Sequence, residues 1–201
     1  GIASLGKYTG NEAVMLCGLC GALLHTANHS FFKSLLFFGA GNIYSQTHTT
    51  HLDKLGGVAK HMPMTAVLFL VATVAICAMP PLNGFVGEFL IYLGMFDSVR
   101  WGVNVLPAAA GLIGLSLIGG FVVLAFSKLY STVFLGTPRH HHVAESREVD
   151  NTRIVAMAIP VIAILCIGLV PQYSVVVIER VALQFMPSAE PVLAGYITPA
   201  L

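Results

Sequence analysis

Four long apolar blocks, separated by short polar loops, constrain this chain more than any other feature. The blocks cover residues 12–43, 64–99, 102–135 and 152–170. Each is long enough for the roughly 20 residues of one transmembrane helix. Charged residues make up only 9% of the chain, against about 25% in a soluble domain. We therefore expect an integral membrane protein, folded as an all-α, polytopic bundle of transmembrane helices.

The first two blocks are too long to be simple spans. Residues 12–43 would form a helix about 48 Å long, which exceeds the roughly 30 Å of a hydrocarbon core. That helix either tilts and overhangs the bilayer or breaks near residues 28–30. The second block is interrupted by Met79-Pro80-Pro81-Leu82-Asn83-Gly84. Because two prolines and a glycine cannot continue a helix, we expect a proline-broken helix there.

Prolines also divide the end of the chain. Pro160 is expected to kink the fourth block and Pro171 to stop it. Beyond Pro171, residues 173–185 predict a short helix, and the chain then continues as a tail. We therefore expect a transmembrane domain over residues 1–172, followed by a short helix and C-terminal tail over residues 173–201.

Two polar loops, residues 44–63 and 136–151, bear on the topology. Both carry lysine or arginine, which favours the cytoplasmic side of the membrane. Both loops can lie on that side only if the broken block counts as one crossing. If its two pieces each cross, the loops lie on opposite faces, and the sequence leaves both arrangements open.

The most telling polar residues are His25, His29 and Lys33, at positions i, i+4 and i+8 of the first block. In a helix these three residues lie along one side and span about 12 Å of its axis. A lysine at the centre of a membrane helix costs about 2.5–3.5 kcal/mol, and intramembrane ionisable groups usually serve function. This spacing predicts part of a proton path.

These three residues also have other interpretations. Lys33 can extend its head group to the interface as a snorkelling side chain. The histidines can hydrogen-bond across helices as core residues or share one metal ion. Since no third metal ligand lies near them in sequence, we expect no metal site.

Glu88 forms a second candidate centre, one turn beyond the predicted helix break. Broken helices at membrane depth free backbone groups that coordinate ions or water, so a carboxylate there is well placed to accept and release a proton. The alternative is a charge favoured by the helix dipole. Lys128, in the third block, either partners Glu88 or snorkels to the interface.

Other cysteine and histidine patterns carry less information. Cys17 and Cys20 form a C-x-x-C with no second pair, which favours helix packing over a zinc site. Residues 140–142 are three consecutive histidines, expected to be a solvated loop with at most unspecific metal binding. The net charge of +1 argues against a nucleic-acid partner.

Three motifs together resemble one membrane-protein family. They are the run from His25 through His29-Ser30-Phe31-Phe32-Lys33 to Gly41, the segment Leu52-Asp53-Lys54-Leu55-Gly56-Gly57, and the proline-broken segment from Met79 to Glu88. They resemble the antiporter-like subunits of respiratory complex I, Mrp-type antiporters and membrane-bound hydrogenases. The stretch Lys128-Leu129-Tyr130 with Phe134-Leu135-Gly136-x-Pro138-Arg139 looks closest to the large antiporter-like subunit of formate hydrogenlyase and hydrogenase-4 complexes.

The resemblance implies a half-channel in an inverted-repeat scaffold. In it, His25 and His29 relay protons along a central polar axis, Lys33 matches the family lysine, and Glu88 matches the terminal acidic or basic residue. The Glu/Lys pair of the family's first repeat is absent, so we expect a C-terminal portion of a longer protein. Such a portion should not pump alone.

The leading hypothesis is a proton-translocating subunit of an energy-converting oxidoreductase complex, located in the inner (cytoplasmic) membrane. The expected partners are the lipid bilayer, the other membrane and peripheral subunits of a hydrogenase or NADH dehydrogenase-like complex, and H⁺, with Na⁺ left open. No flavin, iron–sulfur or nicotinamide motif is present, so we expect no cofactor and no catalytic redox site in this chain. The alternatives are an Mrp-type Na⁺/H⁺ antiporter subunit and a structural membrane anchor.

Overall fold

The computed structural model describes residues 1–102, 105–186, 191 and 193. Within these residues, the regular structure consists of α-helices and two short 3-10 helices. The elements are α1 (Ile2–Thr9), α2 (Glu12–Thr47), η1 (Leu52–Lys54), η2 (Val58–Lys60), α3 (Pro63–Ile76), α4 (Asn83–Arg100), α5 (Val105–Phe134), α6 (His141–Ala144), α7 (Asn151–Leu169) and α8 (Pro171–Leu183).

The chain divides into two compact units. Unit 1 comprises residues 1–29, 78–119 and the chain from residue 165 onward. Unit 2 comprises residues 30–77 and 120–164. The long helices α2, α5 and α7 each contribute one part to each unit.

Helix α2 is one continuous helix of 36 residues, which corresponds to about 54 Å. The break considered near residues 28–30 is therefore wrong, and the expected overhang follows from the length of the helix. Asn28, the polar residue that suggested a break, is instead fully buried with its side chain hydrogen-bonded. A satisfied side-chain amide does not compete for the backbone hydrogen bonds of the helix.

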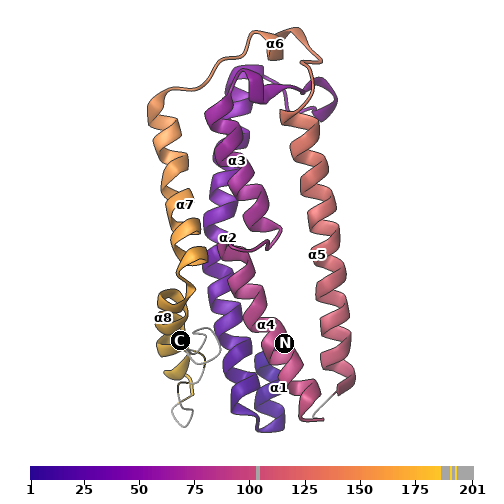
Figure 1. Cartoon of the computed structure of the whole chain (residues 1–201), viewed down its shortest axis with the longest axis vertical. Helices are drawn as coiled ribbons and strands as arrows, with labels where there is room; N and C mark the ends of the chain where they lie inside the picture. The colour runs from indigo at the N-terminus through magenta and orange to yellow at the C-terminus, as the bar shows by residue number, and fades with distance from the viewer. Residues whose placement is uncertain (103–104, 187–190, 192, 194–201) are drawn as a thin grey trace. The chain divides into compact units, whose positions relative to one another are not determined.

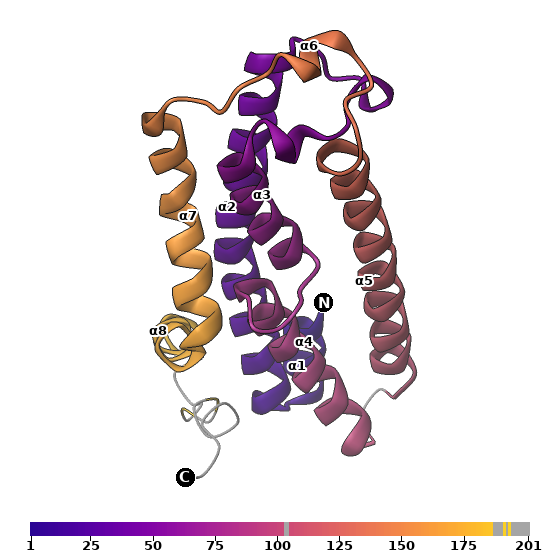
Figure 2. The same cartoon turned by 45° about the horizontal axis from the view of Figure 1, so that its top comes forward.

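Unit 1 is built by α1 and α4 packing against the first part of α2 (Figure 2). Glycines permit the close approach: a Cβ atom on Gly18 would lie 3.0 Å from the Cα atom of Ala3, and one on Gly21 would lie 2.7 Å from Cγ1 of Ile91. Helices that meet through small residues gain van der Waals contact between their backbones. The buried core includes Leu16, Cys17, Cys20, Leu24, Val86, Leu90, Val175 and Ala182.

The expected helix break is present. Helix α3 ends at Ile76 and α4 begins at Asn83. Between them the chain turns through Ala78, whose φ angle is +51°, and the backbone N–H of Leu82 donates to the carbonyl of Met79 at 3.0 Å. The prolines in this segment cannot donate a backbone hydrogen bond, so the helix cannot run through it.

In unit 2, the two polar loops lie against each other (Figure 1). The backbone N–H of Gly57 donates to the carbonyl of Leu135 at 2.8 Å. Arg139 donates from Nη1 to the carbonyl of Leu52 at 3.3 Å. Gly57 has a φ of +65°, a conformation that glycine adopts without strain. Two segments of the family pattern, residues 52–57 and 134–139, therefore form one contact.

Glu148, from the second loop, caps helix α3. Its Oε2 accepts from the backbone N–H groups of Met64 at 2.7 Å and Thr65 at 3.1 Å, and its Oε1 accepts from Thr65 Oγ1 at 2.6 Å. A carboxylate at this place satisfies N–H groups that have no partner inside the helix and faces the positive end of the helix dipole. The cap holds the second loop on the first turn of α3.

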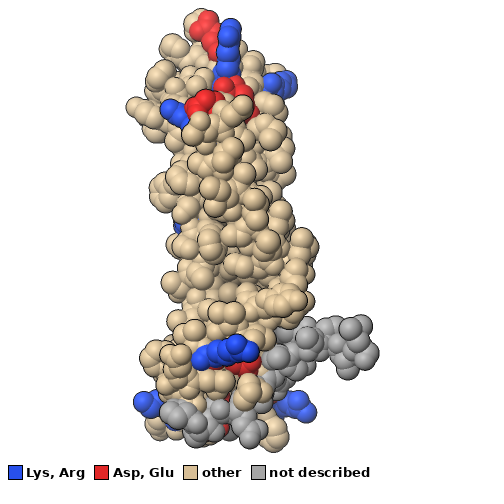
Figure 3. Space-filling view, turned by 90° about the vertical axis from the view of Figure 1, so that its left-hand side faces the viewer, with Lys and Arg blue, Asp and Glu red and all other residues tan. Residues whose placement is uncertain are grey.

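Charged side chains of unit 2 gather at the end that carries these loops (Figure 3). Helix α7 has no charged residue after Arg153 in its first turn. Within the described residues, α5 and α7 are long and apolar enough to cross a membrane by length and composition. Pro160 lies inside α7. Pro171 begins α8 rather than only stopping α7, because proline suits the first turn of a helix.

The expected helix at residues 173–185 is confirmed as α8, two residues earlier at each end. Most of the expected C-terminal tail lies outside the described residues. The proposed domain boundary at residue 172 remains a prediction.

Candidate functional site

The two histidines of α2 lie one helical turn apart in unit 1. Their ring centroids are 6.3 Å apart and the rings are inclined by 38°. His25 is half-buried and His29 is exposed in the isolated chain. The predicted alignment of these two imidazoles along one side of the helix is therefore present in the structure.

Helix α4 approaches α2 at His25. A Cβ atom on Gly87 would lie 3.2 Å from both the backbone N and the Cα atom of His25. At position 87, glycine lets the two helix backbones approach this closely, whereas any side chain would push them apart. Glu88 follows Gly87 directly and is half-buried. The structure thus brings the segment that carries Glu88 against the helical turn that carries His25.

Two asparagines fasten the beginning of α4 to the middle of α2. Asn28 donates from Nδ2 to the backbone carbonyl of Asn83 at 2.7 Å, and Asn83 donates from Nδ2 to Oδ1 of Asn28 at 3.2 Å. Both side chains have no exposed surface. A buried polar group requires such a partner, because leaving it unsatisfied costs about 1–3 kcal/mol.

The asparagine pair was missed by sequence reasoning, although a signal existed. Asn28 stands between the two histidines in an apolar block, and Asn83 is the first residue of α4 after the break. Two isolated amides in apolar surroundings predict that each needs a partner. Nothing in the sequence indicates that they are partners of each other, since 55 residues separate them.

The helix break is also packed against α7. A Cβ atom on Gly168 would lie 2.7 Å from Cα of Leu82. The start of α4 is therefore held between the Asn28 amide on α2 and the backbone of α7, all within unit 1. This double restraint fixes the backbone from which Glu88 projects one turn later.

The two predicted lysines belong to unit 2. Lys33 is half-buried on α2, two helical turns beyond His25, and Lys128 is exposed on α5. Near Lys128, the hydroxyl of Tyr130 donates to the carbonyl of Ala66 at 3.3 Å, which links α5 to α3. The pairing of Lys128 with Glu88 remains a prediction, because the two residues lie in different units.

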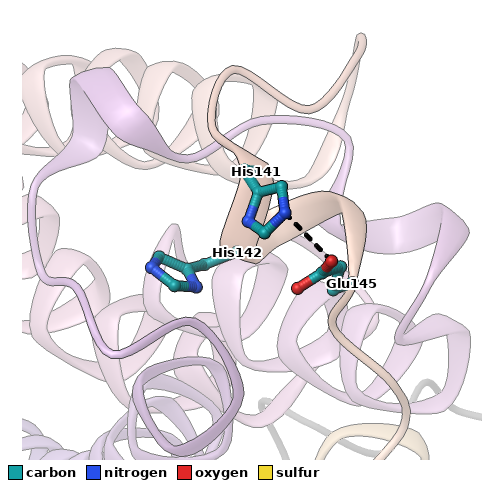
Figure 4. Close-up of side chains that lie close together, drawn as sticks. All are labelled: His141, His142 and Glu145. Carbon is teal, nitrogen blue, oxygen red and sulfur yellow. Dashed lines mark ion pairs between the residues drawn. The ribbon is translucent and has the colours of Figure 1, made fainter.

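The three consecutive histidines are exposed, as expected of a solvated loop. Two of them gather with an acidic residue: donor atoms of His141, His142 and Glu145 lie within 4.8 Å of one another (Figure 4). The structure therefore identifies a cluster of potential metal ligands on α6 and the residue that follows it. The sequence interpretation expected at most unspecific metal binding here.

Comparison with known protein families shows to which family this chain belongs. Residues 2–119 match the family described as NADH:quinone oxidoreductase/Mrp antiporter, transmembrane. This chain belongs to that family. The match includes the histidine pair, Lys33, the helix break and Glu88.

Curated members of the family are similar over most of this chain. Hydrogenase-4 component B of Escherichia coli is 41% identical over 83% of the chain, and formate hydrogenlyase subunit 3 of the same organism is 37% identical over 77%. NADH-quinone oxidoreductase subunit M of Rickettsia prowazekii is 31% identical over 85%. The chain spans about a quarter to a third of the length of these relatives.

A solved structure has a similar fold. A chain in the structure of the Mrp complex from Dietzia sp. DQ12-45-1b superposes with a TM-score of 0.72 at 20% sequence identity. The match covers 92% of this chain and 41% of that one. The expected all-α membrane helix bundle of antiporter-like type is confirmed.

Proposed function

We propose that this chain is the proton-conducting portion of an antiporter-like subunit in an energy-converting hydrogenase-type complex. The observation that carries the proposal is the contact between His25 and Gly87, which seats the Glu88 segment against the histidine turn of α2. The higher identity to hydrogenase-4 and formate hydrogenlyase subunits than to the complex I subunit supports the type of complex.

In this function, His25, His29, Lys33, Glu88 and Lys128 change protonation in turn. Imidazole suits a relay because it accepts a proton on one ring nitrogen and releases one from the other. A carboxylate after a helix break can pass a proton to groups or water at the freed backbone. Redox chemistry in partner subunits supplies the energy, so this chain needs no cofactor of its own.

The asparagine pair serves as a positioning device in this scheme. It fixes the start of α4 relative to α2 and thereby the distance over which a proton moves between His25 and Glu88. A rigid backbone matters here because proton transfer requires donor and acceptor at hydrogen-bond reach, directly or through one water.

The contact between the two polar loops supports a topology in which both loops lie on the same side of the membrane. Residues 44–63 and 136–151 meet in unit 2, so they belong on one side of the membrane. Helix α5 returns the chain to that side in a single crossing, so the broken block of α3 and α4 counts as one crossing. The lysines and arginines of both loops favour the cytoplasmic side by the positive-inside rule. We therefore infer a multi-pass protein of the inner membrane with both loops in the cytoplasm.

The test is proton pumping by the intact complex containing the full-length protein, reconstituted in vesicles. Pumping is started with an electron donor such as H2 and followed with a pH-sensitive dye. Lys33→Ala and Glu88→Gln should abolish pumping while the complex still assembles. Lys60→Ala and Asp53→Asn, which change exposed charges in the first polar loop, are the matched controls.

Three results separate the proposal from its alternatives. Normal pumping in both variants would overturn the relay. Failure of both variants to assemble would favour a structural anchor. Proton movement driven by an imposed Na⁺ gradient without an electron donor would favour an Mrp-type Na⁺/H⁺ antiporter subunit.

A further inference from the structure

We propose that the α6 turn carries a binding site for a divalent transition-metal cation, formed by His141, His142 and Glu145. The site lies in the second polar loop, which contains none of the residues of the proposed proton path. It is independent of the proposed function, so either proposal can fail without the other.

The donor atoms are already gathered. The potential ligand atoms of all three side chains lie within 4.8 Å of one another. Nε2 of His141 is 3.0 Å from Oε1 of Glu145. A dashed line marks this ion pair in Figure 4. The two residues are four apart, so they project from the same side of the helical turn.

The backbone beneath these donors is anchored. Val143 has no exposed surface, and Ser146, only 5% exposed, donates from Oγ to the carbonyl of Val143 at 2.7 Å. The backbone N–H of Glu145 donates to the carbonyl of His141 at 3.2 Å. One face of the turn is thus packed into unit 2, while the ligands extend from the exposed face.

The donor set selects the class of cation. Two imidazoles and one carboxylate suit Zn²⁺, Ni²⁺ or Cu²⁺, whereas Mg²⁺ and Ca²⁺ prefer oxygen ligands alone. Ligands around a tetrahedral zinc ion are roughly 3.3 Å apart. The donors therefore need to close by about 1.5 Å at most, which exposed side chains achieve by rotating. Water completes the coordination as the fourth ligand.

The experiment is a titration of the metal-stripped, purified complex with Zn²⁺, read by competition with a chromogenic chelator. Wild type is compared with His141→Ala and Glu145→Gln. The control is His51→Ala, which removes an exposed histidine from the other polar loop. We expect each site variant to bind one Zn²⁺ fewer per chain, or to bind it at least tenfold more weakly, while the control matches wild type.

Cobalt provides a second readout. Co²⁺ added to wild type should give the visible absorption of a four-coordinate ion, and Glu145→Gln should weaken that absorption. Equal Zn²⁺ binding in wild type and both site variants would overturn the proposal. An equal loss in His51→Ala would overturn it too, because binding would then be a property of scattered surface histidines. Unchanged melting temperatures exclude unfolding as the cause of any loss.

Discussion

At the scale of single residues, the most unusual feature of this chain is its set of polar side chains in apolar helices. A buried polar side chain needs a hydrogen-bond partner, so the partner fixes how the two helices pack. The ionisable residues are visible in the sequence because a charge in an apolar block is rare. The neutral residues that position them are harder to see. The position of the Glu88 segment against the His25 turn depends on three uncharged residues, Asn28, Asn83 and Gly87.

The Asn28–Asn83 pair makes a prediction about stability. Asn28→Ala removes both hydrogen bonds: the backbone carbonyl of Asn83 loses its side-chain donor, and the buried side-chain amide of Asn83 loses its acceptor. We expect a cost of about 1–3 kcal/mol. The measurement is the melting temperature of the purified protein in detergent. The control is Asn42→Ala: Asn42 is also buried on α2, but it donates to the sulfur of Met157 at 3.1 Å, a weak acceptor.

Asn42→Ala should therefore lower the melting temperature less than Asn28→Ala does. Equal losses would mean that the amide pair contributes nothing beyond ordinary packing. If the pair positions the relay, Asn28→Ala should also slow proton pumping in complexes that still assemble.

The approach at Gly87 makes a second prediction. Gly87→Ala would place a Cβ atom 3.2 Å from the backbone of His25, so α2 and α4 must separate, and both stability and pumping should fall. Gly114→Ala on α5 is the control, because among the described residues nothing lies within 4 Å of its added Cβ. Alanine favours a helix interior over glycine by roughly 0.8–1.0 kcal/mol, so the control should be neutral or slightly stabilising.

At the scale of secondary-structure elements, hydrogen bonds hold the two polar loops to each other and to helix α3. The structure shows close approaches within unit 1 at Gly18 and Gly21 of α2, at Gly87 of α4 and at Gly168 of α7. It also joins the two polar loops through Gly57 and Arg139.

The cap on α3 gives the prediction at this scale. Glu148→Ala removes three hydrogen bonds from the first turn of α3, and the loss of a helix cap costs about 0.5–2 kcal/mol. The expected result is a lower melting temperature and faster proteolysis of the second polar loop. Asp150→Ala serves as the comparison, because the side chain of Asp150 forms an exposed ion pair with Arg153 at 3.2 Å, and such pairs are worth little. A larger effect from Asp150→Ala would contradict the assigned role of Glu148.

At the scale of the whole molecule, the proposed topology is testable by labelling. In a cysteine-free background, Asp53→Cys and Arg147→Cys should react with a membrane-impermeant thiol reagent from the same side of the vesicle. Trp101→Cys, between α4 and α5, should react only from the other side. Labelling of the first two positions from opposite sides would show that α3 and α4 each cross the membrane.

Much of the architecture could be predicted because membrane helices leave a strong local signal. Apolar length predicted α2, α5 and α7, and the two prolines at residues 80 and 81 predicted the break before α4. A helix hydrogen-bonds within its own segment, so its existence depends on neighbouring residues alone. The candidate proton carriers could be named for a similar reason, since a charge in lipid is costly wherever the helix packs.

Tertiary structure alone decided which distant groups meet. The Asn28–Asn83 pair joins positions 55 residues apart, and the Glu148 cap joins positions more than 80 apart. No local pattern encodes such contacts, because they depend on how complete helices pack and on where loops return. The sequence by itself thus determined a membrane helix bundle with an ionisable ladder and a broken helix. Packing decided that the helical turn of His25 contacts the segment of Glu88 within unit 1, and that the two polar loops contact each other within unit 2.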